Sequence, residues 1–179
     1  MSNSDKKIKT DIHLIFGTQG AGKSTYSRHL AKTNSAVYLS IDQWMAELFA
    51  RDMPVPMNIG WIMERVQRCE KMIWSTTSSI FQAGGETILD LGFMKVANRN
   101  QFRSLAETAG ACLQMHYISA TRETRLQRVM SRNSEQGDTF SFEVTPSMFH
   151  FMEAEFEPPT EEERSLSIEI DTNQACQAQ

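Results

Sequence analysis

The stretch "HLIFGTQGAGKSTYSRHL", His13 to Leu30, decides the fold of this chain. It matches the pattern G-x-x-x-x-G-K-[ST], which marks a phosphate-binding loop between a strand and a helix. The fixed positions of the pattern are Gly17, Gly22, Lys23 and Ser24. An apolar run over 12–17 predicts a buried strand before the loop, and apolar residues at helical spacing predict a helix from Lys23 to about Thr33. The motif therefore lies in the structural context that it requires.

Each part of this loop has a physical task in binding a nucleotide. The glycines let backbone N–H groups point inward as an anion nest, and the following helix presents its positive end to the same anion. Lys23 is expected to reach the β- and γ-phosphates and Ser24 to coordinate Mg²⁺. The predicted cofactors are ATP and Mg²⁺. The predicted nucleotide contacts are Gly17, Thr18, Gln19, Gly20, Ala21, Gly22, Lys23, Ser24 and Thr25.

Strand and helix patterns alternate along the rest of the chain, which predicts an α/β fold with a parallel sheet covered on both faces. Strands are expected at 12–17, 36–40, 86–92, 112–119 and 166–172, and helices at 23–33, 41–50, 61–83, 96–109, 121–134 and 146–156. We expect a loop at 51–60, a mobile stretch at 133–146 and an acidic turn at 157–165. One domain is expected over 1–179, with 1–10 and 173–179 as frayed tails.

Composition narrows the class of protein. The chain has 179 residues, 40% of them hydrophobic and 22% charged, as in ordinary globular proteins. Its formal net charge of −4 argues against a nucleic-acid partner bound through overall charge. Three cysteines without a CxxC pair predict reduced thiols, and the chain has neither a signal-peptide pattern nor an apolar run long enough for a membrane span. A cytoplasmic monomer or homodimer is expected.

Two carboxylates follow predicted strands at the edge where ligands of such sheets bind. Asp42 follows the second strand and is placed to accept the proton of an acceptor hydroxyl, as phosphoryl transfer requires. Its alternative role is to cap the helix that begins at Gln43. Asp90 lies late in the third strand, where it could hold Mg²⁺ together with Ser24 or orient the acceptor, or form only a structural hydrogen bond with the loop behind it.

The predicted helix at 121–134 carries four arginines, at Arg122, Arg125, Arg128 and Arg132. Arginine suits phosphate because its planar fork binds two oxygens at once. We expect Arg128 and Arg132 to contact the nucleotide and to stabilise the transferring group, with the stretch after the helix acting as a lid. The alternative is a solvated face that pairs with the acidic turn at 157–165.

The acceptor site is less defined by the sequence. The loop at 51–61, together with Gly92 and Phe93, could form an apolar wall over the acceptor, or the loop could be an ordinary packed surface loop. The arginines Arg65, Arg68 and Arg99 are read either as acceptor contacts or as solvated helix residues. His116 lies on a predicted buried strand, where a structural role is expected, and the histidines show no metal-ligand spacing.

Several segments together resemble a known family. They are "GTQGAGKST", "LSIDQWMAELF", "TILDLGF", "RETRLQRVMSRN" and "EVTPSMFHFMEAEFEPPTEEE", and they span nearly the whole chain. They resemble bacterial AAA-type ATP-binding proteins of the P-loop kinase group, similar to zeta toxins, chloramphenicol phosphotransferase and polynucleotide kinase domains. The resemblance implies a three-layer P-loop NTPase fold, a five-stranded sheet of order 2-3-1-4-5 and a helical lid. It also implies that Asp42 matches the catalytic aspartate, and that Arg128 and Arg132 match lid arginines.

The leading hypothesis is an ATP-dependent kinase that transfers the γ-phosphate of ATP to a hydroxyl of a small molecule. Its predicted catalytic residues are Asp42, Lys23, Arg128 and Arg132, and its predicted metal ligands are Ser24 and Asp90. A second hypothesis is a nucleotide-binding regulatory or toxin–antitoxin protein that acts through a protein partner. A polynucleotide 5′-kinase is a third, which the acidic balance disfavours.

Overall fold

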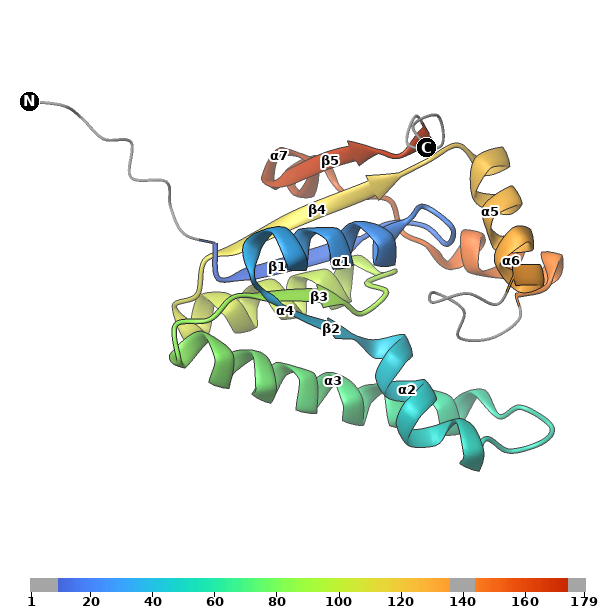
Figure 1. Ribbon diagram of the computed structural model, residues 1–179, viewed down its shortest axis with the longest axis horizontal. Helices are drawn as coiled ribbons and strands as arrows, with labels where there is room; N and C mark the ends of the chain where they lie inside the picture. Colours follow the sequence, from blue (N-terminus) through green and yellow to red (C-terminus); the bar gives the residue numbers. More distant parts are fainter. Residues whose placement is uncertain (1–9, 136–143, 174–179) are drawn as a thin grey trace, which may run out of the picture.

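The computed structural model describes residues 10–135 and 144–173, in which strands and helices alternate (Figure 1). The strands are β1 (Ile12–Phe16), β2 (Val37–Ser40), β3 (Thr87–Asp90), β4 (Leu113–Ser119) and β5 (Ser167–Asp171). The helices are α1 (Lys23–Asn34), α2 (Ile41–Phe49), α3 (Ile59–Gln82), α4 (Val96–Ala109), α5 (Arg122–Glu135), α6 (Pro146–Glu155) and α7 (Glu161–Leu166), with a 3-10 turn at Ala50–Asp52. The predicted tails, apart from residues 10 and 173, and most of the predicted mobile stretch lie outside the described residues.

The five strands form one parallel sheet of order β2-β3-β1-β4-β5, which confirms the predicted fold and strand order. Because all strands run the same way, their carboxyl ends meet at one edge. The register places Ser40 opposite Asp90, so β2 and β3 end together. The phosphate-binding loop follows β1, whose neighbours are β3 and β4. The topology thus brings the loop, the start of α2 and Asp90 to the same edge.

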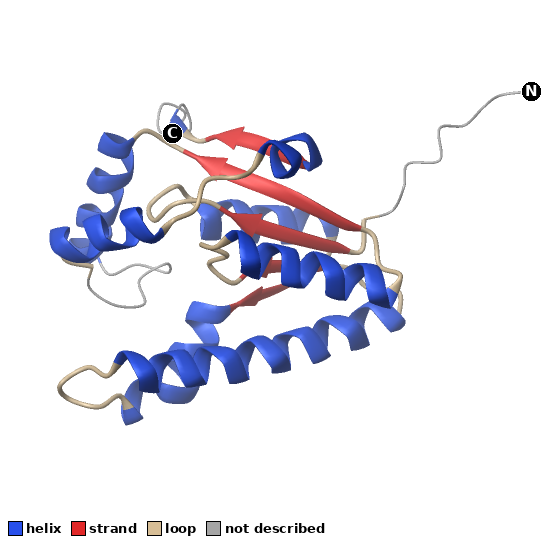
Figure 2. Ribbon diagram, turned by 180° about the vertical axis from the view of Figure 1, so that it is seen from behind, coloured by secondary structure: helices blue, strands red, loops and turns tan. Residues whose placement is uncertain are grey.

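Helices cover both faces of the sheet, so β1 is buried along its whole length. On one face Ile15, Ile88 and Ile118 pack with Ala31 of α1. On the other face the apolar side chains of β1, β3 and β4 pack with Ile73 of α3 and with Phe102 of α4. Figures 1 and 2 show α1 and α4 in front of opposite faces of the sheet. The three layers agree with the prediction from the alternating pattern.

Two helical units extend beyond the carboxyl edge of the sheet. The helices α2 and α3 are joined by residues 50–58 at an end that projects away from the sheet (Figure 1). The helices α5 and α6 hold a small core of their own, in which Val129, Val144 and Phe149 are buried. Pro146 occupies the first turn of α6, as expected. Among the described residues, no helix has the length and apolar composition needed to cross a bilayer.

Most element ends lie within one or two residues of the expected positions, and two differences have a local cause. The helix α3 begins at Ile59, two positions before its predicted start, because the Asn58 side chain accepts a hydrogen bond from Trp61 N at 2.9 Å and caps it. The predicted acidic turn at 157–165 is wrong from residue 161 onward, where α7 forms. Thr160 and Glu163 make a capping box there, each side chain bonding the backbone N–H of the other.

Candidate functional site

The phosphate-binding loop needs its glycines for close packing as well as for backbone shape. Gly17 has a φ of 149°, and a Cβ built there would lie 2.1 Å from Ile118 O of β4. Gly20 has a φ of 78°, and a Cβ there would lie 2.6 Å from Arg125 O of α5. The loop is therefore fitted between β4 and α5, and the third glycine has a steric reason that the sequence pattern did not provide.

Lys23, the first residue of α1, faces two carboxylates. Its Nζ donates a hydrogen bond to Thr18 O at 3.1 Å, across the loop. Burial lowers the pKa of Lys23, while the negative charges of Asp90 and Asp42 raise it. The structure therefore brings the loop lysine together with both carboxylates singled out from the sequence.

Asp42 lies in the first turn of α2 and does not cap that helix. The cap is Ser40, whose Oγ accepts a hydrogen bond from Gln43 N at 3.3 Å. The capping role considered for Asp42 is therefore wrong. Its side chain reaches solvent, yet desolvation by the surrounding groups raises the pKa of Asp42, and the charge of Asp90 raises it further. Lys23 and Arg132 lower it in turn, so Asp42 lies within the field of both cations.

Asp90 is buried at the end of β3 and accepts a hydrogen bond from Tyr38 Oη at 3.0 Å. The bond comes from the neighbouring strand β2, whereas the sequence suggested the loop behind Asp90. Burial raises the pKa of Tyr38 to about 12, and Asp90 contributes to the rise, so the hydroxyl stays protonated and donates. Asp90 is thereby held in one orientation beside the phosphate-binding loop.

The four arginines of α5 fall into two pairs with different surroundings. Arg122 and Arg125 both pair with Glu153 of α6, and Arg125 also donates to Gln19 O of the loop at 3.4 Å. Their predicted pairing with the acidic segment 157–165 is wrong, because the partner lies on α6. These two residues join α5, α6 and the phosphate-binding loop.

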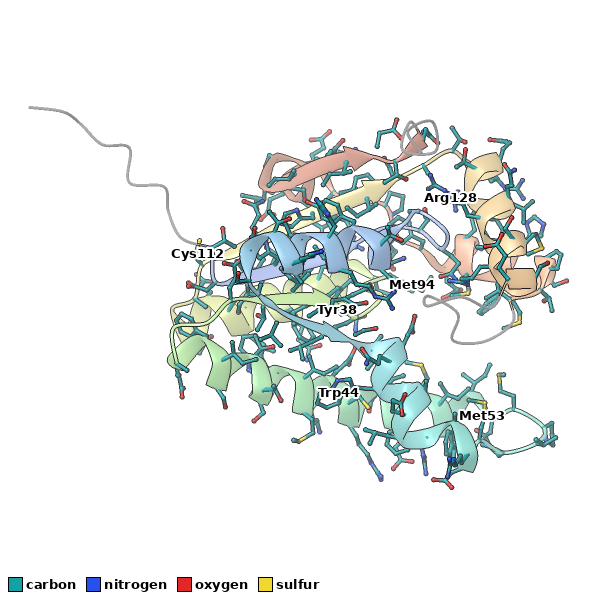
Figure 3. All side chains as sticks on the ribbon, viewed as in Figure 1. Tyr38, Trp44, Met53, Met94, Cys112 and Arg128 are labelled. Carbon is teal, nitrogen blue, oxygen red and sulfur yellow. The ribbon has the colours of Figure 1, made fainter. Side chains whose placement is uncertain are left out.

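Arg128 and Arg132 lie on the loop side of α5. Arg128 donates to Thr172 Oγ1 at 2.9 Å and to Thr172 O at 2.7 Å, and Thr172 Oγ1 donates to Ala21 O at 2.8 Å (Arg128 is labelled in Figure 3). Arg128 is thus tied to the end of β5 beside the loop. The Nε of Arg132 is buried with no hydrogen-bond partner among the described residues, and burial lowers the pKa of Arg132 while Asp42 raises it.

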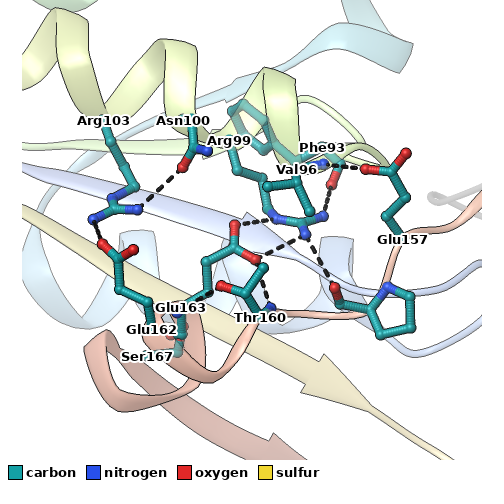
Figure 4. A network of polar contacts seen from close by, with 11 residues as sticks. Phe93, Val96, Arg99, Asn100, Arg103, Glu157, Thr160, Glu162, Glu163 and Ser167 are labelled. Carbon is teal, nitrogen blue, oxygen red and sulfur yellow. Dashed lines mark hydrogen bonds and ion pairs between the residues drawn. The ribbon is translucent and has the colours of Figure 1, made fainter.

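Arg99 is neither an acceptor contact nor a solvated residue, so both interpretations from the sequence are wrong. Its side chain is fully buried and makes two hydrogen bonds to Glu163, at 2.7 and 2.9 Å (Figure 4). Its Nη1 donates to Phe93 O, and its Nη2, which also bonds Glu163, donates to Pro158 O. Phe93 itself is buried against Phe102, so it is a core residue and not a wall of the acceptor site.

The loop at 51–61 does not form the expected wall over the acceptor site. Residues 50–58 lie at the projecting end of the α2–α3 pair, where Met53 is labelled in Figure 3. Val55 is 96% exposed, so the loop is not an ordinary packed surface loop either. The guanidinium carbon of Arg65 lies 3.7 Å from the ring centroid of Trp61, and Arg68 pairs with Glu64 on the same helix.

A chain of hydrogen bonds joins α1 to β4, β1 and the residue that precedes β3. Tyr26 Oη is 2.9 Å from His116 Nδ1, His116 Nε2 is 2.8 Å from His13 Nδ1, and His13 Nε2 is 2.7 Å from Glu86 Oε1. Asn34 also donates to Glu86 Oε1. Because a carboxylate only accepts, His13 donates to Glu86, His116 donates to His13, and Tyr26 donates to His116, with both histidines neutral. Because Tyr26 and Asn34 both lie on α1, the chain fastens that helix near both of its ends.

No group of three or more His, Cys, Asp or Glu side chains among residues 10–135 and 144–173 could hold a metal ion. A magnesium ion bound through one carboxylate, one hydroxyl and nucleotide phosphates does not need such a group. Ser24 and Asp90 are hard oxygen donors at the same edge of the sheet, and they fit that ion.

The fold and the loop define a P-loop nucleotide-binding protein. A family model described as an AAA domain matches residues 12–159, so the chain belongs to that family. A comparison with curated proteins gives no match. The likeness to solved structures covers most of the chain.

Three of these structures carry kinase names. A protein from Chloroflexus aurantiacus J-10-fl to which kinase activity is ascribed aligns with a TM-score of 0.73 and 17% identity, over 95% of this chain and 92% of that one. A gluconokinase from Sinorhizobium meliloti 1021 aligns with a TM-score of 0.66 and 16% identity, over 92% and 83%. A sugar kinase from Janibacter sp. HTCC2649 aligns with a TM-score of 0.60 and 17% identity, over 91% and 86%. At this identity the likeness shows the fold.

Proposed function

We propose that this protein is an ATP-dependent phosphotransferase that moves the γ-phosphate of ATP to a hydroxyl of a small molecule. The observation that carries the proposal is that Asp42, in addition to Asp90, lies close enough to Lys23 for its charge to act on the pKa of Lys23. A nucleotide-binding protein needs one acidic residue near the metal. A second carboxylate facing the phosphate-binding lysine is what a kinase requires to accept the proton of an attacking hydroxyl.

Asp42 acts as the general base in this proposal. Its raised pKa brings it closer to neutral pH, where a carboxylate accepts a proton more readily than an ordinary exposed aspartate does. Its position in the first turn of α2 is fixed by the Ser40 cap, so the carboxylate is carried on a rigid element.

Lys23 and the loop amides hold the phosphates, and Ser24 with Asp90 would hold Mg²⁺. When bound, the ion neutralises charge on the phosphate oxygens. Arg132 has a buried Nε with no hydrogen-bond partner among the described residues and stabilises the transferring group. Arg128 is held by Thr172 beside Gly22 and contacts the nucleotide rather than the reacting phosphate.

The test is ³¹P NMR of ATP·Mg²⁺ incubated with pools of hydroxyl-bearing small molecules. The expected result is a new phosphate-monoester signal that requires both protein and acceptor. Release of inorganic phosphate alone, with every pool, would contradict transfer and leave an ATPase.

One observation favours a second candidate, an ATP-dependent regulatory protein that acts through a protein partner. The projecting end of the α2–α3 pair exposes Leu48, Met53, Val55, Met57, Ile59 and Met63. Exposed apolar side chains gathered at one place are typical of an interaction site. This candidate predicts complex formation that depends on ATP, with slow turnover, and a pull-down with and without ATP separates the two.

A further inference from the structure

The projecting end of the α2–α3 pair exposes apolar side chains from three consecutive segments. They come from the end of α2, from residues 50–58 and from the first turns of α3, and we call them the apolar tip: Leu48, Met53, Val55, Met57, Ile59 and Met63. Ile59 is 69% exposed, and it shares a face of α3 with Met63. Figure 1 shows this end away from the sheet, and Met53 is labelled there in Figure 3. The apolar tip is therefore a candidate interaction surface.

Contacts between the two helices hold the apolar tip in shape. The ring of Phe49, at the end of α2, meets the ring of Trp61, near the start of α3, edge to face, with centroids 6.3 Å apart. The Arg65 guanidinium lies over the same Trp61 ring, and Arg65 Nη1 donates to Trp61 O at 3.1 Å. The Asn58 side chain caps α3. Because these contacts fix α2 against α3, the exposed side chains need little ordering when a partner binds.

The charges of the same segment have both signs and cancel. Residues 47–68 contain three acidic and three basic residues, so the segment has no net charge. A surface that binds anionic lipid carries an excess of Lys and Arg. A surface that selects an acidic or a basic protein carries an excess of the opposite sign. The apolar tip fits neither description, whereas a second copy of the same chain presents a surface that is equally apolar and equally balanced in charge.

Arg51 and Asp52 supply the complementarity that a contact between two copies requires. They are neighbours on the 3-10 turn Ala50–Asp52, between Leu48 and Met53 of the apolar tip, and both are exposed. Neither forms an ion pair within residues 10–135 and 144–173. In a twofold contact, a residue i that meets residue j of the other copy is matched by j meeting i. Arg51 of each copy can therefore pair with Asp52 of the other.

We propose that the apolar tip binds a second copy of this chain in a twofold contact, in which apolar side chains pack together and Arg51 of each copy pairs with Asp52 of the other. The inference does not depend on phosphotransfer, because the contact is measured as a mass, without nucleotide or acceptor. It also gives the apolar tip an occupant other than the protein partner of the second candidate function.

The experiment exchanges charges across the proposed contact. Sedimentation velocity measures the mass of the wild type, of Arg51→Asp, of Asp52→Arg and of an equimolar mixture of the two variants. Arg51→Asp leaves two neighbouring acidic residues on each copy, and Asp52→Arg leaves two basic ones, so like charges oppose each other in either homodimer. In the mixture, acidic side chains of one variant meet basic side chains of the other at both positions.

The wild type is expected to form a dimer. Each charge variant alone should raise the dissociation constant about tenfold or more, and the mixture should form a heterodimer close to the wild type in affinity. Ile59→Asp, which places a charge in the apolar part of the contact, should also favour the monomer. Ile168→Asp is the matched control, because Ile168 is an exposed residue of β5, at the far edge of the sheet from β2, and it should leave the dimer unchanged.

The fold of each variant is checked by circular dichroism, and all three substituted residues of the contact are exposed. A wild-type protein that stays monomeric up to about 100 μM overturns the proposal. A dimer that Arg51→Asp and Ile59→Asp leave intact places the contact elsewhere and also overturns it. The same holds if the two charge variants are monomeric and their mixture does not recover the dimer, or if a monomeric wild type sediments with vesicles of phosphatidylcholine and phosphatidylserine.

Discussion

Two polar regions of this molecule differ in whether their charged side chains form ion pairs. Around Arg99, each charged group has a partner of opposite charge and further hydrogen bonds, and the cluster joins α4 to α7 (Figure 4). At the phosphate-binding loop, the charges of Asp90 and Arg132 act on the pKa values of both Lys23 and Asp42, and none of these four groups forms an ion pair among the described residues.

Charges that are paired within the fold stabilise it, whereas charges without a partner remain able to bind a ligand. A buried charge without a partner is costly, so such a group persists only where something else is gained. Arg99 and Glu163 form hydrogen bonds with each other, so neither charge is available to a ligand. Arg132 has a buried Nε without a hydrogen-bond partner in the described part of the chain, which a phosphate oxygen could satisfy.

The largest effect is expected from Asp42→Asn, which removes the proposed base at nearly constant shape. The rate of phosphate transfer should fall by about 10²–10⁴-fold, the range typical of general-base catalysis. ATP binding, measured by isothermal titration, should remain, because Lys23 and the loop are unchanged. Full activity in this variant would show that Asp42 is not the base and would remove the main contrast between the two regions.

The second prediction concerns the buried ion pair of Arg99 and Glu163. Arg99→Met leaves Glu163 buried without its partner, and such a loss typically costs about 3–5 kcal/mol in the free energy of unfolding. Arg103 pairs with Glu162 at 2.8 Å nearby, but Glu162 is exposed, so Arg103→Met should cost about 0–1 kcal/mol. Urea unfolding at neutral pH measures both.

The double variant Arg99→Met with Glu163→Leu distinguishes a buried charge from lost packing. It removes both members of the pair, so it should recover part of the stability lost in Arg99→Met. Equal stability of the single and double variants would mean that the uncompensated carboxylate of Glu163 is not the source of the loss. Phosphate transfer should stay near the wild-type rate at temperatures where each variant is folded.

The same contrast explains what the sequence could predict. The phosphate-binding loop is a local pattern, and Asp42 and Asp90 stand out in the sequence because both lie at the ends of apolar strands, which meet at one edge of a parallel sheet. Arg99 was misread because its partner, Glu163, is 64 positions away, and only the packed structure brings them together. The helix that carries Glu163 did leave a local signal, since Thr160 and Glu163 have the spacing of a capping box.

The acceptor side was harder to predict for a physical reason. The loop at 50–58 is rich in Met and Pro, a composition that fits both a cover and an exposed surface. Which one forms depends on where α2 and α3 carry it, and that depends on packing along both helices.

A smaller effect is expected from the histidine chain behind the loop. Burial, with the nearby His13, lowers the pKa of His116 to about 4, so the folded state resists protonation that the unfolded chain accepts near pH 6.5. The stability from this group is present above pH 6.5 and is lost as the pH falls toward 4. The expected loss across that window is about 2–3 kcal/mol.

Urea unfolding of wild type and His116→Met at several pH values between 7 and 4 measures this contribution. The variant should show a flatter pH dependence, because its side chain does not titrate. His29→Gln serves as the control, since His29 is exposed on α1 and should leave the profile unchanged. An equally steep loss in His116→Met would assign the acid sensitivity to other groups.

The smallest effect concerns Ser40 and Asp42 at the start of α2, whose substitutions should change stability and activity differently. Ser40→Ala removes the side chain that accepts from Gln43 N, and loss of such a cap costs about 1 kcal/mol of stability. Asp42→Asn should leave stability nearly unchanged, because Asp42 does not cap the helix. Ser40→Ala should in turn keep most of the transfer activity, since the carboxylate remains. If instead Asp42→Asn lowers the unfolding midpoint as much as Ser40→Ala and both retain activity, Asp42 belongs with the satisfied, structural charges, and the loop would lack the base that distinguishes a kinase from a simple nucleotide binder.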